Sequence, residues 1–139
     1  MEKLWNEEVV ELLTDLEALR IAENEGTAGL NNLLYSWLEE YFKNTNFNSP
    51  VLKYVKLNDR AIKMEILSKV ILIQVDGASE LIKISEQSPT REYNIKRFFS
   101  LVTFKDDNQK ILCRKTLFEF LDHHTAEVIK NYSENLVYL

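Results

Sequence analysis

Apolar residues in the first third of the chain recur at helical spacing. They are separated by steps of four, three, four and three, at Trp5, Val9, Leu12, Leu16 and Leu19. Such steps put these side chains on one face of a helix, which we expect over residues 3–24 with a left-handed cap at Gly26. Residues 30–42 repeat the pattern with a broader apolar face. Because the connection between the two segments is short, we predict an antiparallel helical hairpin.

A polar stretch at residues 44–50 interrupts this pattern and ends in Ser49-Pro50. Proline suits the first turn of a helix, so we expect a short helix from Pro50 to about Leu57. A domain boundary here would leave a piece too small to bury a core of its own. We therefore predict one domain over residues 1–139.

From about residue 60 the period changes from 3.6 to 2, which is typical of β-strands. Apolar and charged residues alternate over residues 62–66, and residues 70–75 form an apolar run. The Asp76-Gly77 turn signal then leads into a strand at residues 81–84. We also expect strands at residues 92–105 and 110–113, which gives about five antiparallel strands in one sheet.

The last predicted element is a helix that starts at Thr116. Thr116 and Glu119 have the spacing of a capping box, in which the two side chains satisfy free backbone N–H groups of the first turn. Helices grouped before and after an antiparallel sheet, without strand–helix alternation, define the α+β class. We expect the C-terminal helix to pack on the sheet.

Charge is segregated along the chain. The first 43 residues carry a net charge of −7 and the remainder carries +2, which gives −5 for the whole chain. A surface of one sign attracts complementary surfaces from a distance. The carboxylates Glu7, Glu8, Glu11 and Asp15 are expected opposite the apolar stripe of the first helix. With Trp5 as an apolar anchor, they form the predicted binding surface for a basic protein partner.

The leading hypothesis is therefore a non-enzymatic protein-binding module that sequesters or blocks a basic partner. In size, acidity and lack of catalytic motifs, the chain resembles small acidic immunity proteins of toxins and phage-encoded inhibitors of host defence. A merely solubilising acidic face is the plainer alternative. The apolar C-terminus at residues 136–139 also leaves a homodimer open.

Catalytic and metal-binding patterns are sparse. His123, His124 and Glu127 are close enough on the last helix to draw a metal site, but neither HExxH nor CxxC spacing completes it. Cys113 lies in an apolar stretch and is interpreted as a buried hydrophobe. The acidic pairs, such as Asp106-Asp107, are interpreted as solvated surface groups. No Walker loop, GxSxG or GxGxxG occurs, so we predict no cofactor and no metal.

Two binding alternatives remain. The first is a small-molecule or enzymatic α+β domain, with a pocket between helices and sheet lined by Trp37, Tyr41, Tyr54 and Phe99. Its helices-then-sheet order is similar to the nuclear-transport-factor-like fold, although that family generally ends in strands. The second is a nucleic-acid surface of basic and aromatic residues over residues 91–110, which a sequence pI near 5.1 disfavours.

The chain carries no predicted targeting or membrane segment. Its N-terminus is acidic where a secretory signal is basic, and its longest uncharged apolar run, residues 70–75, is far too short for a membrane helix. The single cysteine cannot form an intrachain disulfide. These observations favour a cytoplasmic protein.

Overall fold

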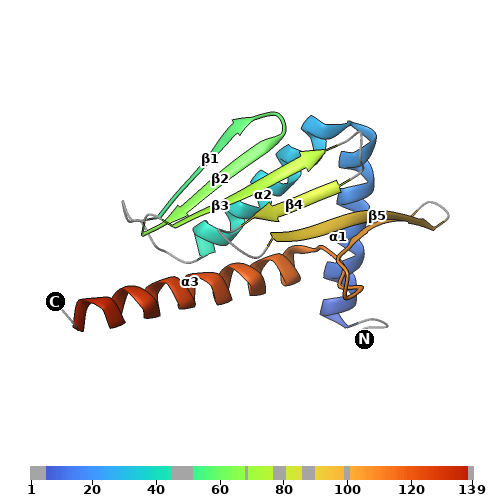
Figure 1. The fold of residues 1–139 in the computed structure, drawn as a ribbon. Helices are drawn as coiled ribbons and strands as arrows, with labels where there is room; N and C mark the ends of the chain where they lie inside the picture. Colours follow the sequence, from blue (N-terminus) through green and yellow to red (C-terminus); the bar gives the residue numbers. More distant parts are fainter. Residues whose placement is uncertain are drawn as a thin grey trace.

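The computed structural model describes residues 6–44, 52–67, 69–76, 81–85, 90–98 and 101–137 (Figure 1). Its elements are α1 (Glu7–Asn24), α2 (Thr27–Asn44), β1 (Leu52–Asn58), β2 (Ala61–Ile66), β3 (Lys69–Asp76), β4 (Leu81–Ser85), β5 (Thr90–Phe98), β6 (Leu101–Lys105) and α3 (Arg114–Val137). The predicted α+β class is confirmed, with two helices first, an antiparallel sheet next and a helix last.

The strands form one antiparallel meander in the order β1-β2-β3-β4-β5-β6, so each strand pairs with its neighbours in sequence. Burial alternates strictly along β2 and β4, as expected for strands with one covered face. The inner face carries the core residues Ile62, Met64, Ile66, Ile71, Ile73, Val75, Ile82, Ile84, Tyr93 and Phe104.

The helices supply the other half of the core. In the view of Figure 1, α1 and α2 lie behind the sheet, and α3 starts beside α1 and runs below the strands. Helix α2 contacts β2 and β3, while α1 contacts β6. The broad apolar face predicted for α2 is buried, including Leu34, Trp37 and Leu38. The fold therefore brings the first and last helices together at one end of the sheet.

The predicted helix from Pro50 to Leu57 is wrong, because residues 52–58 form the edge strand β1. Tyr54 lies opposite Met64 of β2, and its ring stacks on Phe42 of α2 with centroids 4.6 Å apart. Pairing with β2 and packing on α2 outweigh the local helix-start signal, as tertiary context often does.

The strand predictions near the end of the sheet also need correction. The single strand expected over residues 92–105 is two paired strands, β5 and β6. Residues 110–113 form no strand, since only Ile111 makes an isolated bridge to Lys105. About five strands were expected. The edge strand β1 and the division of the 92–105 segment each add a strand, and the expected strand at residues 110–113 is absent, so the described sheet has six strands.

The predicted capping box at Thr116 is misplaced. Helix α3 starts two residues earlier, at Arg114, and Thr116 is its third residue. Thr116 Oγ1 accepts the backbone N–H of Cys113 at 3.1 Å, which is the role of a capping-box residue in the third position. Glu119 is exposed. The remaining cap comes from a different helix, as described below.

The turn between α1 and α2 depends on two glycines. Gly26 has φ +88°, which confirms the predicted left-handed residue after α1. At Gly29 a Cβ atom would lie 2.5 Å from the carbonyl oxygen of Ala22. The helical hairpin is therefore close-packed at a position where only hydrogen fits.

A candidate binding cleft between α1 and α3

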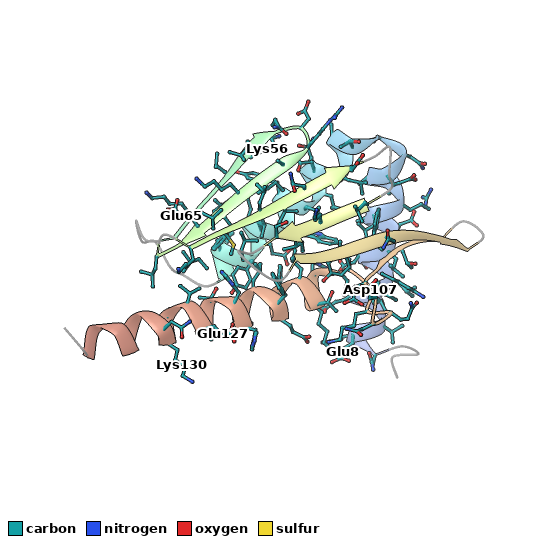
Figure 2. All side chains as sticks on the ribbon, in the orientation of Figure 1. Glu8, Lys56, Glu65, Asp107, Glu127 and Lys130 are labelled. Atoms are coloured by element: carbon teal, nitrogen blue, oxygen red, sulfur yellow. The ribbon has the colours of Figure 1, made fainter. Side chains whose placement is uncertain are left out.

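An open cleft of about 820 Å³ lies where α1, the turn after β6 and the first turns of α3 meet. Sixteen residues line it: Glu8, Val9, Glu11, Leu12, Asp15, Glu40, Gln109, Lys110, Ile111, Cys113, Arg114, Lys115, Thr116, Phe118, Glu119 and Asp122. Figure 2 labels Glu8 at this end of the molecule and, nearby, Asp107 in the turn between β6 and α3. We refer to these sixteen residues as the α1–α3 cleft.

The α1–α3 cleft is acidic. Its lining has six carboxylates and three cationic side chains. Arg114 is neutralised by Asp15 and Glu40, and Lys115 Nζ lies 3.7 Å from Glu8 Oε1 in an exposed pair. Within the described part of the chain, Glu11 and Glu119 make no ion pair. The cleft therefore keeps an excess of negative charge after its internal pairs are formed.

An ion network holds the walls of the cleft together. Asp15 of α1 is 3% exposed, and its Oδ1 accepts from Arg114 Nε at 2.7 Å. Its Oδ2 accepts the backbone N–H of Arg114 at 2.8 Å, which caps the first turn of α3. Arg114 Nη1 also donates to Glu40 Oε1 of α2 at 3.2 Å. Three helices are thus joined through one guanidinium group.

The network fixes the charge of Arg114. Burial acts to lower the pKa of its guanidinium, but the hydrogen bond and charge of Asp15, together with Glu40, raise the pKa above its usual value. The carboxylate of Asp15 also lies at the positive end of α3, where the helix dipole favours an anion. Arg114 is therefore a structural cation with its charge already matched inside the protein.

The structure divides the predicted binding residues into different environments. Glu7, Glu8 and Glu11 are exposed, and the last two line the cleft. The predicted solvent position of Asp15 is wrong, because Asp15 belongs to the buried face with Leu16 and Leu19. Trp5 lies outside the described residues. Sequence reasoning missed Arg114 and Glu40, although Asp15 at helical spacing from Leu12 and Leu19 was a visible sign of a buried carboxylate.

Tyr41 links α2 to α3 beside the cleft. Its hydroxyl donates to Asp122 Oδ1 at 2.7 Å, and its ring packs on Phe118 with centroids 5.3 Å apart. Burial and the bond to Asp122 raise the pKa of Tyr41 to about 12. The phenol is therefore held in its neutral, donating form.

This pKa predicts a loss of stability at high pH. Because the folded-state pKa exceeds the unfolded value of 10, Tyr41 stabilises the fold fully below pH 10 and loses this contribution as the pH rises toward 12. The loss should reach roughly 1 kcal/mol by about pH 11. Urea unfolding should show a smaller fall in stability over this pH range in Tyr41→Phe than in the wild type, by this amount. An equal fall in both proteins would contradict this assignment.

The candidate chemical residues are dispersed. His123 is exposed and lies 3.4 Å from Glu127, whereas His124 is buried and stacks near Phe120. Cys113 is buried, as predicted, but precedes α3 instead of lying in a strand. Among the described residues, no three His, Cys, Asp or Glu side chains are placed to hold a metal ion.

One residue in each of the acidic pairs Glu39-Glu40 and Asp106-Asp107 has a structural role. Glu40 belongs to the Arg114 network, and Asp106 Oδ1 accepts the backbone N–H groups of Asn108 and Lys110 at 2.9 Å each. The latter bonds shape the turn that closes one side of the cleft. The interpretation of these pairs as simple solvated groups therefore does not hold for Glu40 and Asp106.

Trp37, Tyr41 and Tyr54, predicted to line a pocket between helices and sheet, are not among the residues that line the α1–α3 cleft. Trp37 and Tyr41 are buried in the core, and Tyr54 is half-buried against Phe42. On the proposed nucleic-acid surface, Tyr93 is 2% exposed and belongs to the inner face. Phe99 and residues 138–139 lie outside the described residues, as do the side chains of Arg91, Lys96, Arg97 and Phe98.

The fold and cleft define an α+β protein with a meander sheet covered by helices and an acidic groove at one end. Comparison with protein-family models, curated proteins and solved structures finds no match to this chain. In the described part of the chain, no helix combines the length and apolar content needed to cross a bilayer.

Proposed function

We propose that the protein is a non-enzymatic binding module of the inhibitor or immunity type, which sequesters or blocks a basic protein partner in the cytoplasm. The observation that carries the proposal is the acidic α1–α3 cleft, in which six carboxylates face three cations. Long-range attraction between complementary surfaces accelerates association and favours the correct partner. The single cysteine fits a reducing compartment.

The exposed carboxylates Glu8 and Glu11 are the residues to test. Both belong to α1 and line the cleft, and neither belongs to the buried network of Asp15. The double variant Glu8→Lys/Glu11→Lys should therefore fold normally. It should weaken capture of the partner by about tenfold or more at low salt, because the two lysines repel a basic surface that the two glutamates attract.

The matched control is Glu25→Lys/Asp59→Lys, which changes the net charge equally at exposed sites outside the cleft lining. Glu25 lies roughly 25 Å from Glu8 along α1, well beyond a Debye length at physiological salt. Tagged proteins would be used to capture partners from native lysate at low and high salt. Equal capture by both double variants, or capture unaffected by salt, would contradict the proposal and favour a solubilising role.

A further inference from the structure

We propose that the α1–α3 cleft receives a short amphipathic segment of the partner, in which an apolar side chain is adjacent to lysine or arginine. This inference rests on the proposed function and specifies what enters the cleft. A purely electrostatic contact would need only exposed carboxylates. The cleft instead combines carboxylates with apolar side chains from three separate parts of the chain.

The apolar part of the lining comes from Val9 and Leu12 of α1, Ile111 of the turn and Phe118 of α3. Val9 is 44% exposed, and the other three are partly buried. Val10 and Leu13 continue the exposed apolar surface along α1. When a partner covers exposed apolar side chains beside a concave surface, the removal of apolar area from water favours binding. An apolar anchor on the partner is therefore expected.

The charged part of the lining comes from two helices. Glu8 and Glu11 belong to α1, and Glu119 and Asp122 belong to α3. Because Arg114 is already matched by Asp15 and Glu40, it does not neutralise these four carboxylates. Lys115 engages Glu8 only at 3.7 Å, with both side chains more than half exposed, and such pairs contribute little. A cation from a partner can therefore compete for this position.

The dimensions and rigidity of the cleft favour a short segment over a broad surface. Its volume of about 820 Å³ is enough for several side chains and lies within the range of ordinary ligand pockets. The Arg114 network ties α1, α2 and the start of α3 together before any partner arrives. A cleft that is already ordered loses less conformational entropy when a partner binds, so less of the binding free energy is offset.

Synthetic peptides that differ only in their apolar residues test the apolar part of the lining apart from its charged part. Two cysteine-free synthetic peptides of about 12 residues would be compared, with equal numbers of lysines in the same positions. One has leucines on the opposite helical face, and the other has serines there. Calorimetry would give each affinity for the wild type and for two variants of α1.

We expect the Lys/Leu peptide to bind at least about tenfold more tightly than the Lys/Ser peptide. Val9→Ser should lower the affinity of the protein for the Lys/Leu peptide about fivefold. The matched control is Ile21→Ser, which removes a side chain of similar exposure on α1 outside the cleft lining and should leave affinity unchanged.

Equal affinity for the two peptides, absence of binding by both, or Lys/Leu-peptide binding that Val9→Ser weakens no more than Ile21→Ser does would overturn the inference. The proposed function fails separately, when partner capture is insensitive to Glu8→Lys/Glu11→Lys. Salt-sensitive capture of a partner that Val9→Ser does not weaken would retain the function and reject this cleft as the docking site.

Discussion

Replacing Asp15 with alanine is expected to lower the free energy of unfolding by about 3 kcal/mol, the largest effect of any polar substitution considered for this protein. The change leaves the partly buried guanidinium of Arg114 with Glu40 alone. It also removes the acceptor of the first backbone N–H of α3. Urea denaturation followed by circular dichroism would measure the loss.

The control for Asp15→Ala is Glu17→Ala on the exposed face of the same helix. Glu17 pairs with Arg20 in solvent, where ion pairs contribute little, so this variant should be nearly as stable as the wild type. Asp15→Asn retains an acceptor for the Arg114 N–H and should fall between the two. Similar stabilities for Asp15→Ala and Glu17→Ala would show that the network does not stabilise the fold.

The second large effect is expected for Gly29→Ala, which should cost about 2–3 kcal/mol through overpacking. The added Cβ would lie 2.5 Å from Ala22 O and 2.6 Å from Glu25 Cβ. The contact with Ala22 is to backbone, so a side-chain rotation cannot relieve it and the start of α2 must shift from α1. Thermal and urea unfolding would both report the loss.

Gly26→Ala separates this steric effect from the general effect of losing a glycine in the same connection. A Cβ at Gly26 meets nothing within 4 Å, but φ is +88° there. Its cost should therefore be about 1 kcal/mol, from backbone strain alone. A Gly29→Ala protein as stable as the wild type would mean that the two helices can separate freely at this point.

The sequence predicts the fold well where one periodicity dominates. Alternation along β2 and the apolar runs of β3 and α2 follow from the burial of a single face, and these elements lie where expected. The edge strand β1 was missed because its exposed side includes Val55 and Leu57, so no clean alternation marks it. Its identity depends on pairing with β2, which local sequence does not encode.

The cleft was predictable only in part. The acidic character of α1 was visible, and Glu8 and Glu11 do line a concave surface. Their neighbours Arg114, Glu119 and Asp122 come from α3, a hundred residues along the chain, and their proximity depends on how α3 packs. The role of Asp15 reversed for the same reason: a carboxylate on a helix is usually solvated unless a distant cation reaches it.

The sequential order of the sheet has a consequence for how the molecule assembles. Each strand pairing closes a short loop, whereas the Asp15–Arg114 contact joins residues 99 positions apart. Longer loops cost more entropy to close, so the two ends of the chain should meet after most of the meander has paired. The cleft then exists only in the completed fold. A partner that binds there recognises finished molecules and, by mass action, protects them from unfolding.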